Sequence, residues 1–175
     1  DCLPGGCEMS ERLFIGLWPG AAVQDALARW RDAYVWPKGA ALVTDAKLHV
    51  TLHFLGDVAV EKIDALGDAL AVPFSPFTLD IGLPAMWHGG IAVLEPTTLP
   101  DVLLALHATL GDALDRVGLI REQRVYRPHV TLARRAAGAV PPAQARAVAW
   151  PVDGFALMAS RNGRYEVLRA YRAGQ

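Results

Sequence analysis

The tetrapeptide His-Val-Thr-Leu occurs twice in this chain, at residues 49–52 and again at 129–132. Each copy lies in a short apolar segment that is rich in β-branched residues, so each is predicted to form a strand. Four identical residues can recur by chance, but both copies stand on a predicted strand, one in each half of the chain. The repeat therefore indicates a weak internal duplication, with one strand of the same kind in each half.

The hydrophobic pattern around the two copies predicts further strands and helices. We expect Gly56-Asp57 to end the strand that carries the first copy, and Asn162-Gly163 to join the last two strands in a tight hairpin. The predicted strands are 12–18, 48–55, 77–83, 91–94, 129–133, 155–160 and 165–171, and the predicted helices are 21–34, 59–71, 99–117 and a short one near 141–148.

The composition limits what the chain can be. With 175 residues, 53% of them hydrophobic, it can form one domain of ordinary size or two small fused lobes. No run of about 18 apolar residues occurs, so we expect no membrane span and a cytoplasmic location. Both cysteines lie within residues 1–8, which we interpret as an added or upstream extension, leaving 9–175 as a single bilobal domain.

The formal net charge of −1 argues against a protein held on nucleic acid by bulk positive charge. Any RNA contact must therefore come from a local cluster. Five arginines fall between residues 121 and 135, and we interpret most of them as solvated surface residues. Arg134 is the exception, and the planar guanidinium of an arginine suits phosphate oxygens.

On a strand, residues i and i+2 point to the same face, so His49 projects with Thr51, and His129 with Thr131. If the two strands lie side by side about a pseudo-twofold axis, two imidazoles and two hydroxyls face one cavity. This set suits phosphodiester hydrolysis, because one imidazole can take a proton from water while the other gives one to the leaving oxygen. The hydroxyls would hold the non-bridging oxygens.

The sequences HVTLHFLG and RPHVTLARR closely resemble the two paired motifs of the two-histidine (2H) phosphoesterases. The similarity is strongest to the bacterial and archaeal RNA 2′,3′-cyclic phosphodiesterases, also called 2′-5′ RNA ligases. It extends to RLFIGLWP near the start, Trp36, and GFALMASRNGRYEVLRAY near the end, so that it covers essentially residues 11–172.

The resemblance implies an α+β fold of two similar lobes, with antiparallel sheets that form a V-shaped cleft and helices outside. It implies that His49 protonates the leaving 3′ oxygen and that His129 accepts a proton from water. Thr51, Thr131 and Arg134 would bind the phosphate. The implied substrate is RNA with a 2′,3′-cyclic phosphate end and the implied product a 2′-phosphomonoester, with no metal or other cofactor and with the reverse 2′-5′ ligation left open. We expect a monomer.

Other residues near the motifs are weaker candidates. His53 is expected to share a face with His49 and Thr51 and to line the cleft, although strand spacing keeps it too far from His49 to chelate one metal with it. Phe14 and Trp87 could stack on a base or could serve packing. Arg127, beside Pro128, could contact substrate.

Two alternative functions remain open from the sequence. Another branch of the same superfamily would show the same motifs while acting on a small cyclic nucleotide, an ADP-ribose cyclic phosphate or an oligoadenylate. A non-catalytic module that binds RNA ends would keep the pocket, but the presence of both histidines and both threonines disfavours a decayed site.

Overall fold

The computed structural model describes residues 9–174, so the interpretation of residues 1–8 lies outside the described chain. The elements in chain order are β1 (Ser10–Leu17), α1 (Ala21–Asp32), β2 (Ala41–Leu42), the 3₁₀ helix η1 (Asp45–Lys47), β3 (Val50–Ala59), the 3₁₀ helix η2 (Val60–Lys62), α2 (Ile63–Ala69), β4 (Phe77–Trp87), β5 (Ile91–Pro96), α3 (Asp101–Arg116), β6 (Val130–Arg134), β7 (Val148–Val152), β8 (Gly154–Arg161) and β9 (Arg164–Arg172).

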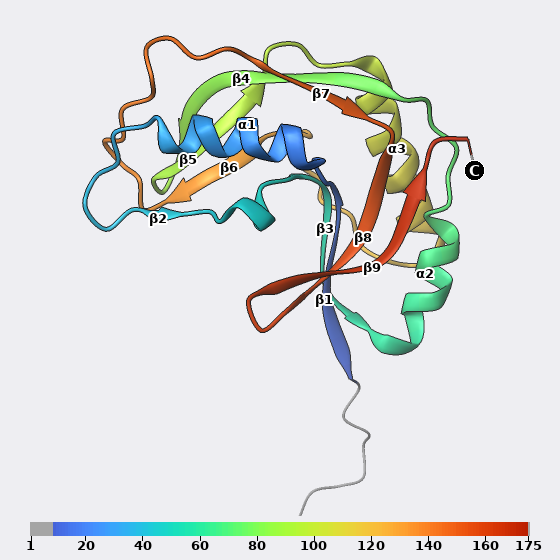
Figure 1. Cartoon of the computed structure of the whole chain (residues 1–175). Helices are drawn as coiled ribbons and strands as arrows, with labels where there is room; N and C mark the ends of the chain where they lie inside the picture. Colours follow the sequence, from blue (N-terminus) through green and yellow to red (C-terminus); the bar gives the residue numbers. More distant parts are fainter. Residues whose placement is uncertain (1–8, 175) are drawn as a thin grey trace, which may run out of the picture.

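The strands form one continuous sheet in the order β7-β4-β5-β6-β3-β1-β8-β9, with β2 paired to β6. Each pair of neighbouring strands in this order is antiparallel. Figure 1 shows that the sheet is strongly curled, with the helices placed around it. The prediction of an α+β fold with antiparallel strands is confirmed.

The two copies of the repeat meet at the middle of the sheet. Strands β3 and β6 are neighbours, and Val50 in the first copy pairs with Val130 in the second. Each copy also ends a similar unit, since β1-α1-β3 and β5-α3-β6 both run strand, helix, adjacent strand. The local similarity in sequence therefore corresponds to a similar local path of the chain.

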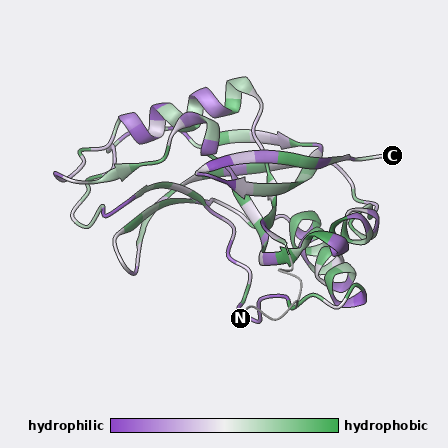
Figure 2. Ribbon diagram, turned by 90° about the horizontal axis from the view of Figure 1, so that it is seen from below, coloured by the Kyte–Doolittle hydropathy of each residue, from purple (hydrophilic) through white to green (hydrophobic). Residues whose placement is uncertain are grey.

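Between β6 and β3 the sheet divides into two halves, β7-β4-β5-β6 and β3-β1-β8-β9. Each of the two longer helices packs on the half that does not contain the strand before it in the chain. Trp30 of α1 donates a hydrogen bond from Nε1 to the carbonyl of Arg146, just before β7, at 2.9 Å. In α3, the carbonyl of His107 accepts a hydrogen bond from His53 of β3 at 2.8 Å. In Figure 2 the helices carry both hydrophilic and hydrophobic residues, as expected of helices that cover a sheet with one face. One large buried cluster includes residues of both halves.

The C-terminal region differs from the sequence prediction at one element. The expected helix near 141–148 is absent from the described chain, and residues 148–152 form strand β7 instead. Pro141 and Pro142 deprive the segment of backbone donors, which disfavours a helix. Pro151 is tolerated in β7 because this strand lies at the edge of the sheet.

Gly56 does not end strand β3, contrary to expectation. The strand runs on to Ala59, and the pairing with β1 skips one residue, because Leu13 pairs with Gly56 and Phe14 with Phe54. Gly56 has a φ of 69°, which glycine adopts readily, so it bends the strand at a bulge. The predicted hairpin at Asn162-Gly163 is confirmed, with φ values of 50° and 73°.

Candidate active site

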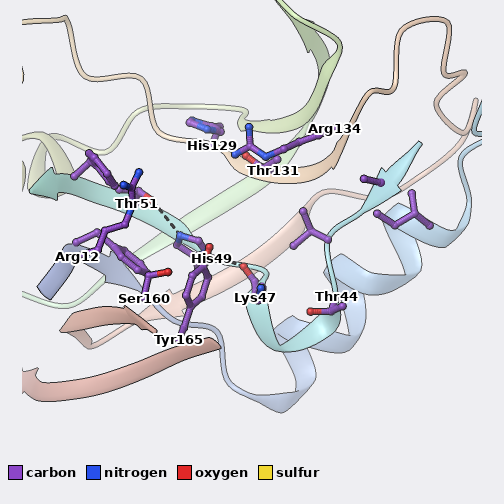
Figure 3. A pocket seen from close by; sticks show the side chains of 15 residues that line it. Arg12, Thr44, Lys47, His49, Thr51, His129, Thr131, Arg134, Ser160 and Tyr165 are labelled. Atoms are coloured by element: carbon purple, nitrogen blue, oxygen red, sulfur yellow. Dashed lines mark hydrogen bonds between the residues drawn. The ribbon is translucent and has the colours of Figure 1, made fainter. Parts of the chain in front are cut away.

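A pocket of about 520 Å³ lies over the meeting point of β3 and β6 (Figure 3). Both histidines and both threonines of the repeat line it, as the sequence predicts. The other lining residues come mainly from β1, β2, the segment before β3, and the β8-β9 hairpin. The lining residues are Arg12, Phe14, Ala41, Leu42, Val43, Thr44, Lys47, His49, Thr51, Phe54, His129, Thr131, Arg134, Ser160 and Tyr165.

Strand alternation explains why these side chains share a face. The valines and leucines of the two copies point the other way and are buried in the core, with at most 2% of each exposed. Because successive strand residues face opposite sides, the histidines and threonines are left on the pocket side. The core therefore fixes the orientation of the polar residues, and a shift of one residue in register would reverse it.

Each histidine is held by the carbonyl two residues before it in the chain. Nδ1 of His49 lies 2.6 Å from the carbonyl oxygen of Lys47, and Nδ1 of His129 lies 2.9 Å from that of Arg127. A carbonyl oxygen can only accept, so Nδ1 carries the hydrogen in both rings. In the neutral form Nε2 is then the free base, and in the charged form it is the acid.

The two Nε2 atoms have different partners. Nε2 of His49 lies 3.0 Å from the hydroxyl oxygen of Thr51, within hydrogen-bond distance. No partner within hydrogen-bond distance of Nε2 of His129 is present in the described part of the chain. The second imidazole is therefore free to take a proton from an incoming molecule.

Burial lowers the pKa of both histidines below the ordinary value. For His49, desolvation is the main cause, opposed by the hydrogen bond to Lys47 and reinforced by the proximity of His129. For His129, desolvation is again the main cause; the hydrogen bond to Arg127 and the charge of Glu95 oppose it, while the charges of Arg127 and Arg134 add to it. The two imidazoles of this pocket, of which His129 helps to lower the pKa of His49, can therefore divide acid and base roles.

The pocket is positively charged. Arg12, Lys47 and Arg134 line it, and none of its described lining residues is a carboxylate. Such a lining attracts phosphate, and the threonine hydroxyls add donors. Arg134 was predicted from the sequence, whereas Arg12 and Lys47 were not. Arg12 could have been found, because it precedes Phe14 by two residues on β1 and so shares its face.

Aromatic side chains surround His49. The ring of Trp18 stacks on the imidazole, with centroids 4.6 Å apart and planes 3° from parallel. Phe14 lies at 5.3 Å and Tyr165 at 5.6 Å, the latter edge-on. Phe14 therefore borders the pocket while it also packs in a small buried cluster, and Trp18 and Tyr165 were not predicted from the sequence. An aromatic face stabilises a nearby cation, so the indole stack opposes part of the effect of burial on the pKa of His49.

Gly16 makes room for this stack. A Cβ atom at Gly16 would lie 3.1 Å from the Trp18 ring and 3.2 Å from the carbonyl of Val50. It would also touch the ring of His49 at 3.5 Å. Strand β1 therefore carries a glycine where the imidazole and the indole lie close to the backbone.

The expectation that His53 shares the face of His49 is wrong. The β1–β3 pairing skips Leu52, since Ile15 pairs with His53 and Gly16 with Thr51. This bulge reverses the alternation, so that His53 lies on the core side with Ile15 and is 4% exposed. Its ring stacks on His107 with centroids 4.0 Å apart, and His107 stacks on Tyr126 at 3.9 Å.

Arg127 lies on the other side of His129 and does not line the phosphate pocket. Its guanidinium forms an ion pair with Glu95 at 2.6 Å and lies over the Trp87 ring, 4.7 Å from the centroid. Trp87 in turn lies 4.0 Å from the His129 ring and donates from Nε1 to Glu95 at 2.8 Å. Arg127, Trp87 and His129 line a second hollow of about 750 Å³ that adjoins the pocket.

Among residues 9–174, no three histidine, cysteine, aspartate or glutamate side chains are grouped so that they could hold a metal ion. None of the helices in this part of the chain is both long and apolar enough to cross a membrane.

Known proteins are similar to this chain in sequence and in fold. RNA 2′,3′-cyclic phosphodiesterase of Escherichia coli (strain K12) is 31% identical over 132 residues, which cover 74% of this chain and 75% of that protein. The protein of the same name from Thermus thermophilus is 32% identical over 164 residues, which cover 85% and 81%. The crystal structure of E. coli LigT complexed with 3′-AMP matches with a TM-score of 0.84 and 29% identity, covering 95% of this chain and 100% of that one. The model of the 2′-5′ RNA ligase superfamily matches residues 19–164, and the chain belongs to this family.

Proposed function

We propose that this protein hydrolyses the 2′,3′-cyclic phosphate at the end of an RNA strand to a 2′-phosphomonoester. The observation that carries the proposal is the pair of imidazoles in one cationic pocket, each held by a carbonyl at Nδ1 so that Nε2 is the reactive atom. The relatives that share the fold are phosphodiesterases of this kind by name.

In the proposed reaction, His129 takes a proton from water through Nε2, and the water oxygen attacks phosphorus. The bond between phosphorus and the 3′ oxygen breaks, and Nε2 of charged His49 protonates the leaving oxygen. Thr51, Thr131 and Arg134 hold the non-bridging oxygens, and Arg12 and Lys47 add positive charge that stabilises the transition state.

The surroundings of the two histidines support this division of roles. His49 is stacked on an indole, which favours a charged donor. His129 lies near Arg127 and Arg134, whose charges favour a neutral acceptor. We also infer that the two strand-helix-strand units are related by a pseudo-twofold axis near Val50 and Val130, so that the sheet opens there as a cleft between two lobes.

The test is to incubate the protein with a short RNA that bears a 2′,3′-cyclic phosphate and to identify the product. A 2′-phosphate end, formed equally in excess chelator, is the expected result. A 3′-phosphate product would mean that the 2′ oxygen is the leaving group. An activity lost with chelator and restored by a divalent ion would contradict a two-imidazole mechanism.

We further propose that the protein is a monomer in the cytoplasm. Gel filtration tests the oligomeric state, and cell fractionation tests the location.

A further inference from the structure

The carbonyl that holds His129 belongs to a segment without regular secondary structure. Residues 119–129, between α3 and β6, form neither helix nor strand. By contrast, the carbonyl that holds His49 belongs to Lys47, the last residue of the 3₁₀ helix η1. Because a segment with few backbone hydrogen bonds of its own opens easily, other contacts must fix the Arg127 carbonyl that accepts from Nδ1 of His129.

Two consecutive side chains fasten this segment to the sheet just before β6 begins. The hydroxyl of Tyr126 donates to the carbonyl of Thr51 on β3 at 2.9 Å. The guanidinium of Arg127 forms its ion pair with Glu95 on β5 at 2.6 Å. Since β6 lies between β5 and β3 in the sheet, the segment is tied to the strands on both sides.

Glu95 also holds the ring that packs on His129. Its Oε1 accepts a hydrogen bond from Nε1 of Trp87 at 2.8 Å, and the same oxygen pairs with Arg127. The guanidinium lies 4.7 Å from the centroid of the indole, whose own centroid lies 4.0 Å from that of the imidazole. One carboxylate, 21% exposed, therefore orders both the indole beside the imidazole and the residue whose carbonyl holds Nδ1.

We propose that Glu95 is a positioning residue for His129, which it holds through Trp87 and Arg127. This inference rests on the proposed hydrolysis, in which His129 accepts the proton of water. Glu95 lines neither the phosphate pocket nor the second hollow, so it acts through these two side chains and not by contact with substrate.

The charge of Glu95 also offsets that of Arg127 beside the base. Burial is the main cause of the lowered pKa of His129; the charge of Glu95 opposes it, and the charges of Arg127 and Arg134 add to it. The charged or titratable groups that face this imidazole from β5, β3, β6 and the segment before β6 are Glu95, His49, Arg134 and Arg127. Those that share a hollow with it are Arg12 and Lys47 in the phosphate pocket, and His88, Glu122 and Arg124 in the second hollow.

The experiment measures the pKa of His129 in the full chain by NMR of the imidazole nitrogens. Glu95→Gln keeps an oxygen that can accept from Trp87 and removes the charge, whereas Arg127→Gln keeps the backbone carbonyl and removes the guanidinium. We expect the pKa of His129 to fall in the first variant and to rise in the second, because the two charges act on it in opposite directions. In the double variant it should lie closer to the wild-type value than in either single variant.

Steady-state hydrolysis of a 2′,3′-cyclic phosphate measures the effect on catalysis. Glu95→Gln should lower kcat by about tenfold with little change in KM, since a misplaced base slows the chemical step more than it weakens binding. The low-pH limb of kcat/KM should move to lower pH. Asp68→Asn is the matched control, because it also removes a carboxylate from an ion pair with an arginine, Arg169 at 2.7 Å, and lines neither hollow.

Other outcomes would overturn the proposal. These are shifts of the same sign in Glu95→Gln and Arg127→Gln, no shift in either, a normal kcat in Glu95→Gln, or an equal fall in kcat with Asp68→Asn. In each case an active wild-type protein would leave the proposed hydrolysis intact. Opposite shifts in a wild-type protein that hydrolyses no cyclic phosphate would contradict the proposed hydrolysis and support the link between Glu95 and His129.

Discussion

His49 and His129 are each followed by Val-Thr-Leu in the sequence but have different neighbours in the folded protein. One stacks on Trp18, whereas the other lies beside Trp87 and two arginines. Removal of either imidazole should lower the rate by roughly 100-fold or more, the usual scale for one general acid or base. The double variant should lose much less than the product of the single losses, because the two residues act as one unit.

A substrate with an activated leaving group separates the two roles. It needs little protonation, so it should restore activity to His49→Ala and leave His129→Ala slow. The measurement compares steady-state rates of both variants on the activated and the ordinary substrate. Equal rescue of both would mean that the donor and acceptor assignments are wrong or interchangeable.

The lowered pKa values predict the pH dependence of catalysis. The acceptor must be neutral, so activity falls at low pH, and the donor must be charged, so activity falls at high pH. Since burial lowers the pKa of both rings from the ordinary value of about 6.5, the maximum of kcat/KM should lie below about pH 6.5. The two apparent pKa values of this bell-shaped profile belong to the coupled pair of histidines and need not be assigned to either residue alone. A kcat/KM that keeps rising beyond neutral pH would contradict this.

Gly16 offers a test of the stack around His49. In Gly16→Ala the new methyl group meets the indole at 3.1 Å and the carbonyl of Val50 at 3.2 Å, so the Trp18–His49 stack must shift. We expect a fall in kcat of roughly tenfold or more, since small misplacements of catalytic groups are costly. Thermal unfolding reports any accompanying loss of stability. Gly20→Ala is the control, because a Cβ there meets nothing within 4 Å; a normal kcat for Gly16→Ala would show that the stack is not needed.

Strand phase explains which site residues could be predicted from the sequence. Regular alternation in the two repeats is enough to place four polar residues on one face, and the structure agrees. His53 was misplaced because the bulge at Leu52 reverses the alternation, and nothing in the local sequence indicates where a bulge falls. Lys47 and Tyr165 were missed because their positions depend on how distant segments of the chain meet.

The same limit applies to whole elements. Strand β7 was not recognised because its five residues include a proline, which only an edge position allows, and edge position is a property of the assembled sheet. The order of the strands also depends on contacts that no local pattern encodes. By contrast, α1, α3 and the Asn162-Gly163 hairpin carry strong local signals and were predicted at nearly the correct bounds.

The stack of His53, His107 and Tyr126 joins β3, α3 and the segment before β6. Desolvation, with smaller effects of His53 and Arg121, lowers the pKa of His107 to about 4. The unfolded chain therefore binds a proton near pH 6.5 that the folded protein does not bind until about pH 4. Above about pH 6.5 this group takes nothing from the free energy of unfolding. As the pH falls from about 6.5 toward 4, the free energy of unfolding decreases by about 2 kcal/mol, a figure that includes solvent screening of this partly buried ring.

The variant His107→Phe keeps an aromatic ring in the stack and removes this titration. Its free energy of unfolding should fall less steeply than that of wild type between about pH 6.5 and 4, as measured by urea denaturation at several pH values. His88→Gln, which changes an exposed histidine of the β4–β5 turn, is the control because it leaves the stack intact. Parallel curves for His107→Phe and wild type would show that His107 is not protected from protonation in the folded state.

The two halves of the molecule share one sheet, and each of the two longer helices packs on the half that does not contain the strand before it. Strands β3 and β6 join the halves at the centre, α1 packs beside β7, and α3 packs on β3. Neither half can therefore keep its core covered if the other unfolds. We expect one cooperative thermal transition, with calorimetric and van't Hoff enthalpies that agree.

Trp30→Phe tests this coupling at a single contact. The change removes the hydrogen bond from the indole to the Arg146 carbonyl and part of the packing of α1, at a cost of about 1–3 kcal/mol. Helix α1 covers the half of the sheet that contains β4, whereas β8 lies in the other half. If the halves unfold together, the slowest backbone amides of β4 and of β8 should nevertheless exchange their hydrogens faster by the same factor. Faster exchange confined to β4, β5 and β7 would show that the halves open separately and that the central β3–β6 contact, which includes the Val50–Val130 pair, is a hinge between them.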